Sequence, residues 1–159
     1  MAFVKNKKQF LDSLKAADGE ARRRFARRVV DVIWTLHHEI VANTPVWSGS
    51  AVANYRWSIG LPDLTFVDPI DNGPPGPTNT MPLGMEPRRK PNEEVAYETL
   101  EALTFSDPFK VFWLNNNDPE IMDIEFGKAP PPPLVIRNPQ GMIGLSLEFV
   151  HAKLQAGQL

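Results

Sequence analysis

The stretch that decides the fold runs from Glu20 to Asn43 and reads EARRRFARRVVDVIWTLHHEIVAN. Its apolar residues recur at steps of three and four, and this spacing places them on one face of an α-helix. The helix ends at Thr44-Pro45, because the residue before a proline is pushed out of the α region. The predicted apolar face consists of Phe25, Val29, Val32, Ile33, Leu36, Ile40 and Val41.

The residues before this helix predict a second, shorter one. Between Lys7 and Ala17, Phe10, Leu11 and Leu14 stand at helical spacing, which is typical of a short amphipathic helix. We expect a break at Asp18-Gly19, with Asp18 as the N-cap of the long helix.

The residues after the long helix predict a tight turn and then a strand. Pro45 and Gly49 bracket the turn, and Gly49 is able to take a positive φ angle there. Thr44 is expected to close the helix by a hydrogen bond from its side chain back to the chain. From Ala51 to Ile59 the residues alternate as in a half-buried strand, although the first of them fit a helical turn equally well.

Residues Leu61 to Pro91 have a different composition, with eight prolines and three glycines. That density of fixed φ angles and missing N–H donors excludes a regular helix or strand. A loop of about 30 residues inside a compact domain indicates a function of its own. We expect an extended arm that orders against a neighbouring molecule, with Pro74, Pro75 and Pro77 among its contact residues.

The remainder of the chain predicts alternating helices and strands. In order, these are a helix from Pro91 to about Leu103, a strand from Phe109 to Leu114 stopped by Asn115-Asn116-Asn117, a short helix after Asp118-Pro119, a proline-rich linker at 128–137, and a final helix capped by Asn138-Pro139 with Ile143, Leu147 and Val150 facing inward. The whole pattern predicts a single α+β domain over 1–159. In it, a small mixed sheet packs against the long helix and the C-terminal helix.

Composition narrows the classes of function. A net charge of −2 gives no global basic excess of the kind that favours nucleic-acid binding. The absence of cysteine excludes disulfides and cysteine-based zinc sites. The N-terminus lacks an apolar signal core and the chain lacks a long apolar run, so we expect synthesis in the cytoplasm and no membrane partner.

The His37-His38-Glu39 sequence is the strongest candidate for a metal site, and it fails. The zincin motif needs a second histidine four residues after the first, and Ala42 occupies that position. Adjacent histidines project about 100° apart on a helix, so we interpret both as helix-surface residues. No pattern predicts a nucleophile or a phosphate cradle either. We therefore expect no enzyme, no metal and no cofactor.

Five arginines form a basic band near the start of the long helix: Arg22, Arg23, Arg24, Arg27 and Arg28. Cations near a helix N-terminus oppose the helix dipole, which indicates an external anion. Two interpretations stay open: an ion-pair surface against another subunit, and the lining of a DNA channel. Some of the five fit a merely solvated surface. Trp47, in the turn, is the tryptophan that we expect at an interface.

Three stretches carry a resemblance to a known family. The first is an amphipathic helix leading into Thr44-Pro45-Val46-Trp47-Ser48-Gly49 and the strand-like segment 54–59. The second is a strand ending in asparagines, followed by a short helix and Ile124-Glu125-Phe126-Gly127. The third is the linker and the helix from Asn138 onward. In this order the stretches resemble the tail-completion family of long-tailed bacteriophages, also called minor tail or neck proteins. Ile121-Met122 departs from the family, which commonly has tyrosine and alanine there.

The resemblance covers roughly Phe25 to Val150, without the 61–91 loop, and implies a structural virion protein. Such a protein assembles with itself into a ring, expected to be a hexamer, at the neck between head-completion proteins and the tail tube. It completes the tail and joins it to the head, with passive DNA contact in its channel. Glu125, able to accept backbone N–H groups across a turn, joins the assembly candidates, and Gly127 joins Thr44, Pro45 and Gly49 as scaffold residues. The alternatives are a tail terminator and a soluble cytoplasmic binding or adaptor module.

Overall fold

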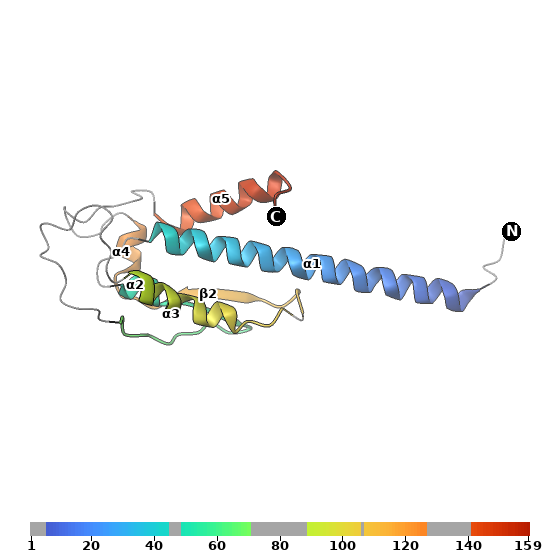
Figure 1. Cartoon of the computed structure of the whole chain (residues 1–159), viewed down its shortest axis with the longest axis horizontal. Helices are drawn as coiled ribbons and strands as arrows, with labels where there is room; N and C mark the ends of the chain where they lie inside the picture. The colour runs from blue at the N-terminus through green and yellow to red at the C-terminus, as the bar shows by residue number, and fades with distance from the viewer. Residues whose placement is uncertain (1–5, 45–48, 71–88, 106, 127–140) are drawn as a thin grey trace, which may run out of the picture.

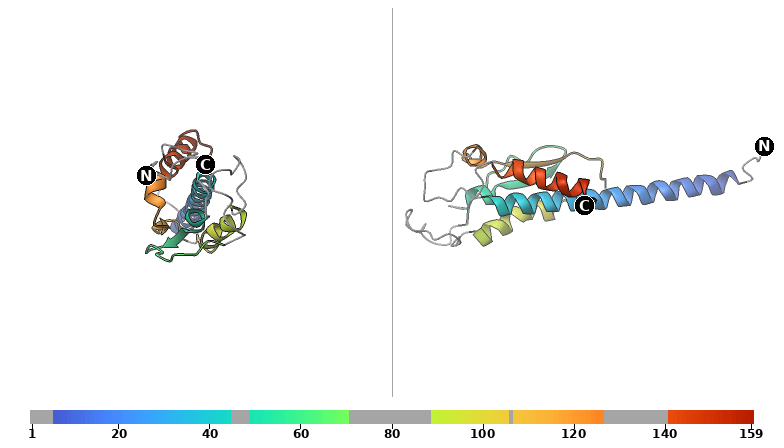
Figure 2. Two further views of the ribbon diagram at one scale, coloured as in Figure 1. Left: turned by 90° about the vertical axis from the view of Figure 1, so that its left-hand side faces the viewer. Right: turned by 90° about the horizontal axis from the view of Figure 1, so that it is seen from above.

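One helix of 37 residues, α1 (Lys7–Asn43), dominates the molecule and extends far beyond the other elements (Figure 1). The structure is a computed structural model that describes residues 6–44, 49–70, 89–105, 107–126 and 141–159. Asn6 caps the helix by accepting a hydrogen bond from the backbone N–H of Gln9. The body of the protein surrounds only the C-terminal half of α1 (Figure 2).

The expected break at Asp18-Gly19 is wrong, because α1 continues through both residues. A glycine inside a helix costs only about 1 kcal/mol relative to alanine, which does not by itself end a helix. An ion pair between Asp18 and Arg22 at 3.0 Å spans Gly19, and a second pair between Glu20 and Arg24 at 2.9 Å follows directly after it. The segments predicted as two helices are therefore one.

The predicted end of α1 and the predicted positive φ of Gly49 are confirmed. Thr44 Oγ1 donates to the carbonyl of Ile40 at 2.6 Å, and Gly49 has a φ of +85°. A Cβ atom at Gly49 would lie 2.4 Å from Nδ2 of Asn92, so the position requires glycine for two reasons. Pro45 and Trp47 lie outside the described residues.

The sheet has two antiparallel strands, β1 (Tyr55–Ile59) and β2 (Phe112–Asn116), with Trp57 opposite Leu114. The residues just before β1 form a short helix, α2 (Ser50–Ala53), which was the alternative for the start of this strand. Strand β2 begins three residues later than predicted and continues into the asparagines. These asparagines do not stop the strand, because their side chains bind the carbonyls of neighbouring segments.

Three further helices complete the fold: α3 (Arg89–Glu101), α4 (Ile121–Glu125) and α5 (Ile143–Gln155). Helix α3 starts at Arg89, two residues before the predicted start at Pro91. The helix tolerates Pro91 in its first turn because the N–H groups there have no intrahelical partner, so the N–H that proline lacks is not missed. In α5, Leu147 is half exposed, so its predicted inward position is wrong. The buried row along this helix is instead Met142, Ser146 and Val150, at steps of four.

The core lies between the C-terminal half of α1 and the sheet, with α3 packed beside it and α5 on another side of α1 (Figures 1 and 2). Its buried apolar members are Ile33, Ile40, Val41, Ala51, Val52, Tyr55, Trp57, Ala96, Leu100, Ile121 and Met142. A long N-terminal helix, a small sheet and a C-terminal helix confirm the predicted α+β class.

His37 is a core residue, and its interpretation as a surface histidine is wrong. Its side chain is fully buried, and its Nδ1 accepts a hydrogen bond from Nε1 of Trp57 at 3.0 Å. The ring also stands edge-on to Tyr97, with 4.5 Å between centroids. Burial, and then the neighbouring His38, lower the pKa of His37 to about 4. His37 lies on the same helix face as Ile33 and Ile40. The sequence pattern that defined this face counted apolar residues alone, so it did not predict that a histidine is buried there.

Candidate assembly surfaces

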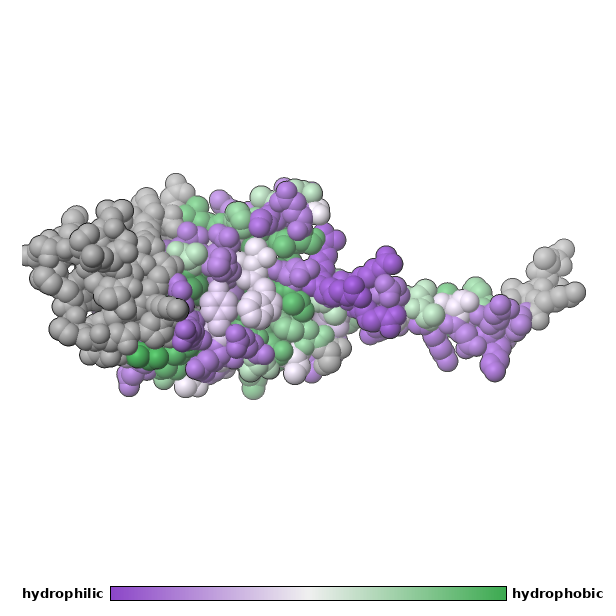
Figure 3. Space-filling model, in the orientation of Figure 1, coloured by the Kyte–Doolittle hydropathy of each residue, from purple (hydrophilic) through white to green (hydrophobic). Residues whose placement is uncertain are grey.

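The N-terminal half of α1 projects from the body with apolar side chains in the open (Figure 3). Phe10 is 53% exposed and Leu14 is 50% exposed. They belong to a row at helical spacing that continues towards the body: Phe10, Leu14, Ala17, Ala21 and Phe25, all exposed. The same face of α1 is packed against the core further along. We call these five residues the α1 apolar row.

Most of the basic band is engaged within the chain. Arg22 pairs with Asp18 and lies over the ring of Phe109, 5.4 Å from its centroid. Arg23 and Arg24 both bind Glu20 and hold the pKa of its carboxyl below the usual value. Ion pairs this exposed contribute little to stability.

Arg27 and Arg28 differ from these three. Both are exposed, and neither makes an ion pair with any residue in the described part of the chain. The structure therefore leaves two cations of the band available to a partner.

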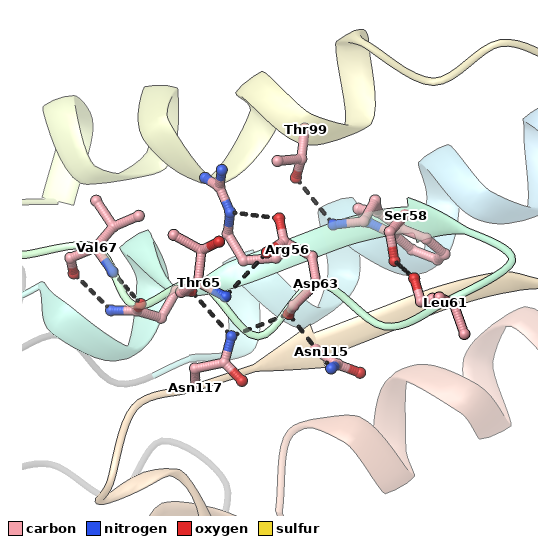
Figure 4. A network of polar contacts seen from close by, with 11 residues as sticks. Arg56, Ser58, Leu61, Asp63, Thr65, Val67, Thr99, Asn115 and Asn117 are labelled. Atoms are coloured by element: carbon pink, nitrogen blue, oxygen red, sulfur yellow. Dashed lines mark hydrogen bonds and ion pairs between the residues drawn. The ribbon is translucent and has the colours of Figure 1, made fainter.

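The segment Leu61–Ile70, which we call the strap, crosses the outer face of the sheet and is held there by its backbone (Figure 4). The side chains that hold it come from both strands and from the residues flanking them. Ser58 Oγ donates to the carbonyl of Leu61 at 2.6 Å, and Asn117 Nδ2 donates to that of Thr65 at 2.9 Å. Further bonds run from Trp113 Nε1 to Gly60 and from Asn115 and Asn117 to Asp63.

Two buried asparagines bind the strap in the manner of a neighbouring strand. Asn54 accepts from the N–H of Val67 and donates to its carbonyl, each at 2.8 Å. Asn92, at the start of α3, accepts from the N–H of Ile70 at 2.8 Å and donates to its carbonyl at 3.3 Å. The far end of the strap is thereby fixed beside α3.

One ion pair lies within the same network. Arg56 Nε binds Asp63 at 3.5 Å, with both side chains largely shielded from water. Hydrogen bonds from Thr65, followed by the charge of Arg56, keep the pKa of Asp63 below its usual value. The pair fixes the beginning of the strap to β1.

The strap exposes apolar side chains: Leu61, Leu64, Phe66 and Ile70. The beginning of the predicted arm is thus bound to its own chain by polar contacts and presents an apolar row outward. Pro74, Pro75 and Pro77 lie outside the described residues.

Two residues of the sequence motifs, Thr44 and Glu125, meet at the start of α5. Thr44 Oγ1 lies 3.0 Å from the Tyr55 hydroxyl and 3.4 Å from Sδ of Met142. The carboxylate of Glu125 accepts hydrogen bonds from three successive backbone N–H groups, and the first of these belongs to Met142. This shared contact joins the end of α1 to the cap of α5.

Glu125 caps α5 from a different element. Its oxygens accept from the N–H groups of Met142 and Ile143 at 2.9 Å and of Gly144 at 3.2 Å. The sequence predicted an acceptor of backbone N–H groups at Glu125, but placed the donors across the turn to Gly127, which lies outside the described residues. A carboxylate at a helix N-terminus also complements the helix dipole.

Two features of the surface had no signal in the sequence. The bonds that hold the strap depend on tertiary placement, so nothing near Asn54 or Asn92 in the chain indicates them. Helix α3 also carries a row of exposed carboxylates, Glu94, Glu98 and Glu101. The amphipathic pattern of this helix predicts only that these residues face water.

Two further features are absent from the part of the chain that the structure describes, a metal-holding cluster and a membrane-spanning helix. No group of three or more histidine, aspartate or glutamate side chains is placed to hold a metal ion there. Over the same residues, no helix combines the length and the apolar character needed to cross a membrane.

Comparisons with protein-family models, with curated proteins and with solved structures give no match to this chain.

Proposed function

We propose that this protein is a structural subunit of a tailed-bacteriophage virion that forms a ring at the neck, where it completes the tail and joins it to the head. The observation that carries the proposal is the projecting half of α1. Its apolar row is exposed and meets the described body at one end, where the ring of Phe25 stacks on Phe109 at 5.3 Å between centroids. The monomer thus leaves the surface from Phe10 to Ala21 suited to a neighbouring subunit.

The physical reason is the weakness of isolated helices. A helix shorter than about 12–15 residues is marginal in water, and longer ones gain most of their stability from packing of an apolar face. The N-terminal half of α1 has such a face, and from Phe10 to Ala21 its apolar side chains are exposed. Assembly would supply the missing contact.

The motif residues support the proposal in a second way. Thr44, Gly49 and Glu125, which carry the resemblance to tail-completion proteins, all have structural partners and serve to position helices. Such roles suit a scaffold whose function is assembly. A ring subunit needs a rigid body and exposed surfaces, and both are present in the described residues.

The first experiment is native mass spectrometry with negative-stain electron microscopy over a protein concentration series, at low and at moderate salt. We expect a closed ring with an axial channel. Monomers or dimers at every concentration would contradict the proposal.

The second experiment tests the neck function itself. In a phage whose copy of this gene is interrupted, full heads and separate tails should accumulate, and adding purified protein to the lysate should restore joined virions. Normal virions in the absence of the protein would exclude the neck function, even if rings form.

A deletion tests the arm. Asn92 holds Ile70 at the start of α3, so the residues flanking 72–86 can be rejoined without moving the body. We expect the deletion of 72–86 to abolish the ring and to leave a monomer with unchanged circular dichroism. Rings formed by this variant would remove the arm from the assembly mechanism.

A further inference from the structure

The charge of the projecting helix identifies the kind of surface that covers it. Between Lys7 and Arg28, eight basic residues stand against three acidic ones. Two copies of this segment packed along each other would bring like charges together, which opposes association. The partner of the α1 apolar row is therefore expected to be acidic.

The protein itself offers an acidic surface on another element. From Glu93 to Glu101, α3 has four glutamates and no basic residue. Glu94, Glu98 and Glu101 recur at steps of four and three, so they lie on one face of the helix. All three are exposed, and none makes an ion pair within the described chain.

The strap, which meets α3 in its first turns, supplies an apolar surface. Asn92, in the first turns of α3, holds Ile70 at the end of the strap, so the strap and α3 meet there. The strap exposes Leu64 and Phe66. The two neighbouring elements thus expose negative charge on α3 and apolar side chains on the strap, as the projecting helix exposes positive charge and its apolar row.

We infer that the N-terminal half of α1 in one copy docks on the α3 face and strap of the next copy, with Arg27 and Arg28 against Glu94, Glu98 and Glu101. The inference rests on the proposed ring and names the surfaces that build it. Donor and acceptor lie on different parts of the chain, so the contact is heterologous, and heterologous contacts close into rings when the rotation between copies permits.

The in-chain pairing of the band favours a protein partner over DNA. Asp18 and Glu20 already neutralise Arg22, Arg23 and Arg24 in part. A surface that mixes both signs of charge with phenylalanine and leucine suits a protein interface better than a phosphate backbone.

Charge exchange tests this interface. The donor variant is Arg27→Glu with Arg28→Glu, the acceptor variant is Glu98→Lys with Glu101→Lys, and a third variant carries all four changes. Glu148→Lys, an exposed reversal on α5, is the matched control. Circular dichroism and thermal unfolding of each monomer show that it is folded, and native mass spectrometry gives the concentration at which half of the protein is assembled.

We expect the donor and the acceptor variant each to raise that concentration at least about tenfold, which corresponds to roughly 1.4 kcal/mol. The combined variant should return to within about threefold of the wild type, and the control should stay there. Unchanged assembly in either reversal, or no recovery in the combined variant, would overturn the interface.

The alternative partners give distinct results. If the wild type forms rings and the donor reversal weakens only binding to duplex DNA, the band lines a DNA channel and this interface is wrong, while the proposed ring stands. If the wild type forms no ring at any concentration, the proposed function fails and the interface fails with it.

Discussion

At the scale of single residues, Gly60 and Gly141 have almost the same backbone conformation but different surroundings. Their φ angles are +85° and +86°. A Cβ atom at Gly60 would meet nothing within 4 Å, whereas one at Gly141 would lie 2.6 Å from the backbone carbonyl oxygen of Glu125. The two positions therefore separate the cost of a left-handed conformation from the cost of a steric overlap.

We predict that Gly60→Ala lowers the free energy of unfolding by about 1–2 kcal/mol, from the backbone alone. Gly141→Ala should lower it by about 1–3 kcal/mol more, because the added methyl group overlaps the backbone of α4. Urea unfolding followed by tryptophan fluorescence measures both values. Equal losses in the two variants would show that the contact between Gly141 and Glu125 is loose.

The buried histidine makes stability depend on pH. The folded-state pKa of His37 is about 4, below the ordinary value of 6.5, so the folded protein binds fewer protons than the unfolded chain between these two values. The stabilisation is complete above the unfolded pKa of 6.5 and is lost as the pH falls towards 4. We predict a loss of about 2 kcal/mol in the free energy of unfolding between pH 7.5 and pH 5.

His37→Gln should weaken this pH dependence, and His38→Gln is the control because His38 is exposed. Glutamine still offers an oxygen to Nε1 of Trp57 but does not titrate. A wild-type slope that survives in His37→Gln would assign the pH dependence to other groups.

At the scale of elements, the cap supplied by Glu125 ties the start of α5 to α4. Glu125→Ala leaves three N–H groups at the start of α5 without their acceptor, and we predict a loss of about 2 kcal/mol in the free energy of unfolding. Glu125→Gln should lose less, since one oxygen acceptor remains. Amide exchange at Met142, Ile143 and Gly144 should quicken in the alanine variant, and wild-type exchange rates there would argue against the cap.

The strap depends on Asn54 for its central attachment. Asn54→Ala removes both bonds to Val67, so opening of the strap should rise at least about fivefold, the factor that corresponds to roughly 1 kcal/mol. Limited chymotrypsin digestion should then cut more rapidly at Leu64 and Phe66. Asn115→Ala, which removes a single long bond of 3.4 Å, is the control. Faster cutting throughout the chain would indicate global unfolding in place of strap release.

How far the sequence predicts these elements depends on how local their causes are. The helix from Glu20 to Asn43, its end at Thr44 and the positive φ of Gly49 follow from neighbouring residues, and all three are confirmed. The break at Gly19 is wrong because a single glycine is a weak stop signal, and here the ion pair between Asp18 and Arg22 spans it. Glu125 was predicted as an acceptor, but its donors lie 17 to 19 residues further along the chain, beyond any local pattern.

At the scale of the whole molecule, the two halves of α1 have different environments. The C-terminal half is packed within the body, whereas the N-terminal half projects from it and touches it through Phe25 and Arg22 at Phe109 (Figures 1 and 2). A helical segment that is held only by its own hydrogen bonds unfolds locally with little cost in free energy. A segment packed in the core unfolds only when the core does.

We therefore predict rapid amide exchange over residues 10–21 in the monomer, slowed at least about tenfold when the protein assembles. Residues 33–41 should exchange slowly in both states and serve as the internal control. Equal exchange over 10–21 before and after assembly would place the subunit contact elsewhere.

The bonds between Asn92 and Ile70 also bear on how such a chain can diverge. They set the separation of two points on the chain, Ile70 and Asn92. Closure entropy grows with the logarithm of loop length, so each doubling of the intervening stretch costs only about 0.6 kcal/mol. Insertions and deletions there would alter reach and specificity at almost no expense to the domain, so this stretch is where related proteins would be free to vary.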